Sequence, residues 1–91
     1  MTKSDNLKIK NKKEISNWLI TYVSQLVEMK PENIVTNVTF VSYGIDSTGA
    51  VGLSGDLSNW LGCPLDANLI YDHPTIDALS QHLHETFFDG N

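Results

Sequence analysis

The chain has 91 residues, 41% of them hydrophobic, which is enough for one domain but short for an enzyme with a deep pocket. Its net charge is −5 and is unevenly spread. All six lysines lie at or before Lys30 and the chain has no arginine, whereas residues 31–91 hold eight acids and no Lys or Arg, a net charge of −8 for that part with histidine neutral. This excludes a nucleic-acid-binding face in the C-terminal two thirds. The acidic part is expected to attract basic partners, with plain solubility as the alternative.

The sequence also disfavours a membrane-spanning or secreted protein and a site built from cysteines. No apolar run approaches the ~18 residues of a membrane span, and Met1–Lys13 is polar with no signal-peptide pattern, so a cytoplasmic protein is expected. The single cysteine, Cys63, can form neither an internal disulfide nor a cysteine metal site, and is expected to be a buried or half-buried thiol.

The first helix is predicted over residues 12–28, after a mobile tail over residues 1–11. Apolar side chains recur at the i, i+3, i+4, i+7 spacing of an amphipathic helix, and Pro31 marks its end. This stripe consists of Ile15, Trp18, Leu19, Tyr22, Val23, Leu26 and Val27.

Residues 31–45 show no helical period and are predicted to form a long loop, of a kind that is often functional in small proteins. A short strand is the alternative. Its apolar side chains are expected to pin the loop to the bundle: Ile34, Val35, Val38 and Phe40.

Three more helices follow. One is predicted over 47–61, with Asp46 as N-cap and Gly62 as C-terminal cap, and a short one over 66–71, with Leu69 and Ile70 buried. The last is predicted over 74–88, with Pro74 at its first position. Their apolar stripes are Ala50, Leu53, Leu57, Trp60 and Leu61 in the second helix, and Ile76, Leu79, Leu83 and Phe87 in the last.

The predicted fold class is therefore all-α: a small four-helix bundle with three substantial helices, one short helix and a long loop between helices 1 and 2. Residues 12–88 form the domain, and residues 89–91 are expected to be frayed. The predicted core comprises Trp18, Leu19, Leu26, Leu53, Leu57, Leu79 and Leu83.

Ser47 is the residue with the most informative chemical setting. It follows a glycine turn and an acid, in the first exposed turn of a predicted helix. Unpaired amides and the helix dipole favour a phosphate at such a position. A serine that only helps to cap the helix is the alternative interpretation.

The motif around this serine resembles the Gly-x-Asp-Ser attachment motif of acyl carrier proteins. Tyr43-Gly44-Ile45-Asp46-Ser47 carries it, and Ala50-Val51-x-Leu53 and Leu61-Gly62-Cys63-Pro64-Leu65 are similar to the helix that follows. Ile70-Tyr71-Asp72-His73-Pro74-Thr75-Ile76, with Leu79 and Leu83, resembles the last-helix entry of polyketide-type carriers. The resemblance covers about Ile15 to Phe87.

The resemblance implies a specific function. A phosphopantetheinyl transferase would move 4′-phosphopantetheine from coenzyme A to Ser47, and the arm would hold an acyl group as a thioester. The protein itself would catalyse nothing. It would present its cargo, as a monomer, to a ligase, ketosynthase, acyltransferase or tailoring enzyme of polyketide or lipid-like natural-product biosynthesis. The residues that the resemblance places against the arm or a partner are Asp46, Thr48, Val51, Gly52 and Ile70.

The sequence departs from the family pattern near Ser47. Thr48 stands where a large apolar residue is usual, and Gly52 where glutamate is common. Gly49, Gly52 and Gly55 recur every third residue and are predicted to face outward, opposite the apolar stripe. They reflect either drift or a bare surface shaped for an unusual partner.

Other functions remain as alternatives. A peptidyl carrier is the main rival, although the acid before the serine, Asp46, favours an acyl carrier. A remote hypothesis is a serine hydrolase in which His73, with Asp72 or Asp77, activates Ser47. A helical adaptor that is never modified is a third. No metal site is expected, because His82 and His84 are two residues apart and do not share a helix face, while His73 is expected to be structural.

Overall fold

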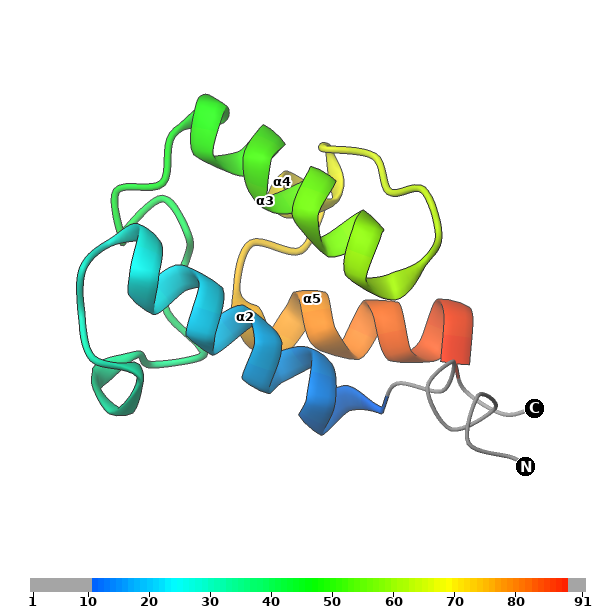
Figure 1. Ribbon diagram of the computed structural model, residues 1–91, viewed down its shortest axis with the longest axis horizontal. Helices are drawn as coiled ribbons and strands as arrows, with labels where there is room; N and C mark the ends of the chain where they lie inside the picture. Colours follow the sequence, from blue (N-terminus) through cyan, green and yellow to red (C-terminus); the bar gives the residue numbers. More distant parts are fainter. Residues whose placement is uncertain (1–10, 89–91) are drawn as a thin grey trace.

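The computed structural model describes residues 11–88, with side chains for residues 11–86, and shows a bundle of helices (Figure 1). The helices are α2 (Lys12–Leu26), α3 (Ser47–Leu61), α4 (Leu69–Asp72) and α5 (Ile76–Leu83), with a 3₁₀ turn η1 (Pro31–Asn33) and a π-helical segment η2 (His84–Phe88). Within residues 11–88 there is no strand, only an isolated bridge between Thr39 and Thr75. The predicted all-α bundle with one short helix is confirmed. The predictions for residues 1–10 and 89–91, and for the Phe87 side chain, lie outside the described residues.

Helix α2 begins with a capping box rather than directly after a tail. The Asn11 side chain accepts a hydrogen bond from the Glu14 N–H at 2.8 Å, and the Glu14 carboxylate accepts one from the Asn11 N–H at 3.1 Å. Asn11, predicted to belong to the tail, is therefore the N-cap. The helix ends at Leu26, two residues earlier than predicted, because Glu28 adopts a left-handed conformation with φ 60°.

Helix α3 has the predicted bounds, and both predicted caps are confirmed. Asp46 Oδ1 accepts a hydrogen bond from the Gly49 N–H at 2.9 Å, and Gly62 closes the helix with φ 78°. Helix α4 starts later than predicted, at Leu69. The prediction that Pro74 occupies the first position of the last helix is wrong. Thr75 is the N-cap of α5, and its hydroxyl accepts a hydrogen bond from the Ala78 N–H.

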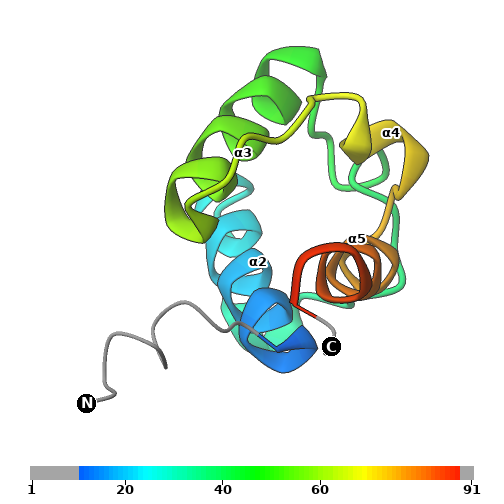
Figure 2. The same cartoon turned by 90° about the vertical axis from the view of Figure 1, so that its right-hand side faces the viewer.

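The core lies between the four helices, which surround a common interior in Figure 2. It is almost entirely aliphatic. Its members are Ile15, Leu19, Val23, Ile34, Phe40, Ile45, Ala50, Leu53, Leu57, Ile70, Ile76, Leu79 and Leu83. Burying this apolar surface is the main stabilising contribution to the fold.

Four predictions about buried side chains are wrong. Leu26 is 44% exposed at the last turn of α2, and Trp18 is only half-buried at the surface between α2 and α3. Val35 does not pin the loop: its side chain is exposed, whereas Ile34 and Phe40 are buried. Leu69 is half-buried, so that in α4 only Ile70 enters the core.

No helix in the described part of the chain is long and apolar enough to cross a membrane.

Candidate functional site

Ser47 is the first residue of α3, and its side chain is exposed. A tight turn precedes Ser47 in the chain. Gly44 takes φ 87°, a conformation that side-chain-bearing residues rarely adopt, and its N–H donates to the Val41 carbonyl at 2.9 Å. Directly after this turn, the buried side chain of Ile45 anchors the segment in the core. The result is a serine hydroxyl that projects from a fixed turn into solvent.

The electrostatics of the turn combine two opposed effects. The first amides of a helix carry a partial positive charge that favours a phosphate at Ser47. Asp46 already accepts from one of these amides, that of Gly49, and its carboxylate is next to Ser47 in the chain. A phosphodiester on Ser47 would be attracted by the helix and repelled by this carboxylate.

The loop before Ser47 is held by hydrogen bonds to distant elements. The Tyr43 hydroxyl accepts from the Val35 N–H at 2.6 Å and donates to the Val35 carbonyl at 3.2 Å. The Phe40 N–H donates to the Pro74 carbonyl at 2.8 Å, which joins the loop to the start of α5. These hydrogen bonds hold in place the long loop for which the sequence predicted no regular structure.

An apolar pocket of about 190 Å³ lies beside the start of α3. It is lined by Thr39, Phe40, Val41, Ile45, Ala50, Ile70, Tyr71 and Pro74. Ala50 is one helical turn after Ser47, so the pocket opens close to the serine. Its volume is below the roughly 300 Å³ at which small-molecule pockets usually begin. It therefore fits a short apolar group.

The five residues predicted to contact an arm or a partner divide into two groups. Asp46, Thr48, Val51 and Gly52 are exposed on or beside the first turns of α3, and Val51 is 59% exposed. Ile70 is buried and is a wall of the pocket. Val41 and Tyr71 also line this pocket and are largely exposed, yet sequence reasoning missed them as site residues. Periodicity could identify neither residue, because the loop that contains Val41 has no helical period and α4, which contains Tyr71, is only four residues long.

The three glycines of α3 do not share one outward face. A Cβ on Gly49 would lie 3.0 Å from Ile45 Cγ2 and 3.7 Å from Leu26 Cδ2, so Gly49 faces α2, and the prediction is wrong for this residue. A Cβ on Gly52 would lie 3.7 Å from the Tyr22 hydroxyl oxygen, at the edge of the same helix. Only Gly55 has open space around it, as predicted.

The remaining reactive side chains have other surroundings. The rings of His73 and His82 stack at 3.9 Å with 15° between their planes, a contact that the sequence did not predict. Within the described residues, no group of three or more His, Cys, Asp or Glu side chains is placed to hold a metal ion. Burial raises the pKa of the Cys63 thiol, which lowers its reactivity.

The structure gives no support to the serine hydrolase hypothesis. Across residues 11–88, no strand leads into Ser47 as a nucleophile elbow requires, and no hydrogen bond joins Ser47 to a histidine. His73 instead packs its ring face against His82.

Comparisons with known proteins agree on one family. The family model described as "Phosphopantetheine attachment site" matches residues 17–83. The chain is 33% identical over 70 residues to the acyl carrier protein TtuC of Teredinibacter turnerae, a match that covers 77% of this chain and 80% of TtuC. It is 32% identical over 75 residues, 82% of this chain, to a phenolphthiocerol/phthiocerol polyketide synthase protein of Mycobacterium tuberculosis, and spans only 4% of that protein.

Two solved structures are also similar. The acyl carrier protein Asl1650 from Anabaena sp. PCC 7120 gives a TM-score of 0.81 at 33% identity, over 86% of this chain and 89% of that one. A free-standing peptidyl carrier protein from Acinetobacter baumannii gives a TM-score of 0.78 at 36% identity, over 82% and 94% of the two chains.

Proposed function

Because the chain belongs to the phosphopantetheine attachment site family, whose cofactor is covalent 4′-phosphopantetheine, we propose that Ser47 is the attachment point and that the protein is an acyl carrier of the polyketide synthase type. The observation that carries the proposal is the exposed Ser47 hydroxyl at the N-terminus of α3, directly after the Gly44 turn. When bound, the arm supplies a thiol that carries the acyl group. The protein's part is to hold and present it, without catalysis.

The residues at the site fit such an arm. The Ser47 side chain is exposed, and the amides of the first turn of α3 favour the phosphate. Asp46 opposes tight binding of the phosphate by charge repulsion, which leaves the arm free to move between partners. The neighbouring pocket, with Ile70 as a wall, accepts a short apolar stretch of the arm or its cargo.

The proposed partners are a phosphopantetheinyl transferase and acyl-loading or acyl-processing enzymes of a polyketide pathway. We place their contacts on Asp46, Thr48, Val51 and Gly52, which surround Ser47 on exposed turns. An exposed valine one turn from the serine offers an apolar contact, and the nearby bare Gly52 allows close approach. We further propose that the carrier acts as a monomer in the cytoplasm and that residues 12–88 form the working domain.

The decisive experiment is intact-mass measurement after incubation of the full chain with coenzyme A and a promiscuous phosphopantetheinyl transferase. The wild type should gain one arm and Ser47→Ala none. Ser54→Ala is the matched control, because Ser54 is on the same helix but is buried, with its hydroxyl donating to the Val51 carbonyl at 2.9 Å. Ser54→Ala should gain one arm. An arm on Ser47→Ala, or a wild type that never accepts one, would contradict the proposal.

A peptidyl carrier is the second candidate, favoured by the similarity to the Acinetobacter baumannii protein. The two are separated by loading the phosphopantetheinylated chain with an acyltransferase and malonyl-coenzyme A, or with an adenylation enzyme and an amino acid. A higher kcat/KM with the acyltransferase supports the acyl carrier, and the reverse order supports the peptidyl carrier.

The partner contacts have a separate test. Gly52→Glu places the residue common in the family beside Ser47, where the structure has room for a side chain. If a partner approaches the bare backbone closely, the variant should fold normally while its kcat/KM with the native partner enzyme falls. Equal kcat/KM values would show that Gly52 reflects sequence drift.

A further inference from the structure

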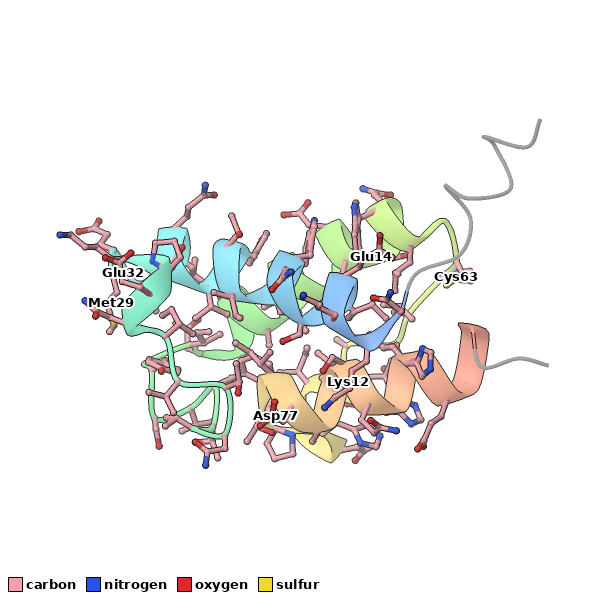
Figure 3. The ribbon with its side chains drawn as sticks, turned by 90° about the horizontal axis from the view of Figure 1, so that it is seen from below. Lys12, Glu14, Met29, Glu32, Cys63 and Asp77 are labelled. Carbon is pink, nitrogen blue, oxygen red and sulfur yellow. The ribbon has the colours of Figure 1, made fainter. Side chains whose placement is uncertain are left out.

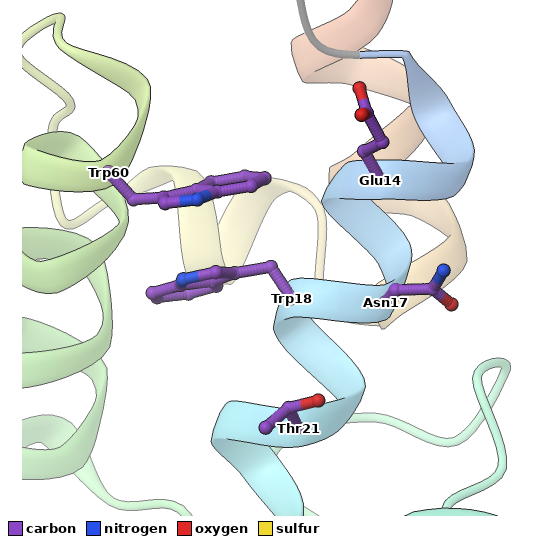
Figure 4. A pocket seen from close by; sticks show the side chains of 5 residues that line it. All are labelled: Glu14, Asn17, Trp18, Thr21 and Trp60. Carbon is purple, nitrogen blue, oxygen red and sulfur yellow. The ribbon is translucent and has the colours of Figure 1, made fainter. Parts of the chain in front are cut away.

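Both tryptophans of the chain lie together at the surface between α2 and α3 (Figure 4). The Trp18 and Trp60 rings stack with centroids 5.4 Å apart and 18° between their planes. Tyr22 stacks on Trp18 at 5.0 Å and 20°, so that three aromatic rings form one row. All three are only half-buried, while the core is aliphatic except for Phe40. Partly exposed tryptophan clusters are characteristic of surfaces that bind other proteins.

An open groove of about 460 Å³ adjoins this row. Its lining combines the two indoles with three polar side chains, those of Glu14, Asn17 and Thr21. Glu14 is already one half of the capping box, where its Oε1 accepts from the Asn11 N–H. A carboxylate offers about four acceptor positions, so this bond leaves most of its capacity for a ligand.

The groove lies far from the proposed attachment site. Trp60 follows Ser47 by 13 residues on the same helix, which at 1.5 Å per residue is about 20 Å. Figure 1 shows α3 running from its start at the upper left of the view to its end at the lower right. A partner held at the groove would leave Ser47 accessible.

The chemistry of the lining suits one side chain best. A guanidinium is planar, stacks on an indole ring and donates two parallel hydrogen bonds to a carboxylate. The Glu14 side chain and the two indoles line the same groove, with Glu14 one helical turn before Trp18 on α2. Lys12, which would repel a cation, points to a different side of α2 from Glu14 (Figure 3). The compact ammonium of lysine cannot stack in the same way.

We propose that this groove binds an arginine side chain of a partner protein. The chain contains no arginine, so it cannot fill the site from its own sequence, and the Glu14 carboxylate in the lining is complementary in charge to a guanidinium. The groove acts as a docking point that holds the carrier while other enzymes reach Ser47. The inference rests on the groove alone and does not depend on Ser47 being modified.

The test is a titration of the full chain with the peptide N-acetyl-Gly-Arg-Gly-amide, followed through the indole N–H signals in NMR spectra. Because Trp18 and Trp60 are the only tryptophans of the chain and both line the groove, these signals report on it. Both should shift and saturate. A peptide with citrulline, which keeps the planar shape without the charge, should bind at least tenfold more weakly.

Two matched variants isolate the role of Glu14. Glu14→Gln should weaken binding of the arginine peptide about tenfold without changing Tm, because glutamine at this position preserves the capping box. Glu32→Gln makes the same change at the other end of the molecule (Figure 3) and should leave binding unchanged. The proposal is overturned if the indole signals do not shift, or if the citrulline peptide, or one with leucine, binds as well as the arginine peptide. Equal weakening by both variants would overturn it too.

Discussion

The Tyr22 hydroxyl donates a hydrogen bond to Asp56 Oδ2 at 2.7 Å and thereby joins α2 to α3. The closest packing of α2 is against α5, and its link to α3 runs largely through side chains. This bond and the Trp18–Trp60 stack are two such links. Besides the shared aliphatic core, aromatic side chains of α2 therefore help to set the orientation of the helix that carries Ser47.

Removing the Tyr22 hydroxyl should loosen this connection. Tyr22→Phe keeps the ring stack and loses the hydrogen bond, so the free energy of unfolding should fall by about 0.5–1.5 kcal/mol. Urea denaturation at pH 7, followed by circular dichroism, measures the change. Tyr71→Phe is the control, because Tyr71 is exposed on α4, and should have little effect.

The same pair gives the fold a dependence on alkaline pH. Burial, and then the hydrogen bond to Asp56 and its negative charge, raise the pKa of Tyr22 to about 12 from its ordinary value near 10. A raised pKa in the folded state stabilises the fold fully below pH 10, and this contribution is lost as the pH rises through 12. Between these values the wild type should lose stability more steeply than Tyr22→Phe. Parallel pH profiles of the two denaturation midpoints would contradict this.

Two leucines test the assignment of core and surface. Leu57→Ala should lower the free energy of unfolding by about 2–5 kcal/mol, because the side chain is fully buried. Leu26→Ala makes the same chemical change at a position that is 44% exposed and should cost less than half as much. Similar losses for both would mean that the end of α2 is buried in solution.

The end of α2 offers a stabilising substitution. Glu28 has φ 60°, and the Met29 N–H donates to the Ser24 carbonyl at 2.9 Å, as in helix ends that are normally closed by glycine. Glu28→Gly should raise stability by about 0.5–1 kcal/mol, because glycine adopts this conformation without strain. Glu28→Ala keeps the strain and should show no such gain in thermal denaturation.

The glycines of α3 should respond differently to the same substitution. Gly55→Ala adds a methyl group in open space and should stabilise the helix by about 1 kcal/mol. Gly49→Ala places a Cβ 3.0 Å from Ile45 Cγ2, within the turn that precedes Ser47, and should lose most or all of this gain. Equal Tm increases for both would show that the Ile45 side chain moves without cost.

Local signals account for what could be predicted from the sequence. The predicted bounds of α3 are correct because Asp46 and Gly62 cap the helix through hydrogen bonds to residues close to them in the chain. The position of Ser47 at the start of α3 follows from these bounds. The exposure of Leu26 and the inward position of Gly49 depend on how α2 lies against α3, which periodicity within one helix does not contain. The stacking of His73 on His82 likewise has no characteristic spacing in the sequence, because it depends on how separate elements pack.

The hydrogen bonds that hold the loop also constrain the order in which the protein folds. The Asp77 N–H donates to the Thr36 carbonyl at 3.0 Å, and the Phe40 N–H donates to the Pro74 carbonyl, so each pair joins residues more than 30 positions apart. Contacts of such separation form only after the intervening chain has closed on itself. The turn that presents Ser47 therefore takes its final shape only once α5 has docked. Local opening of α5 should expose the amides of Phe40 and Asp77 to hydrogen exchange together.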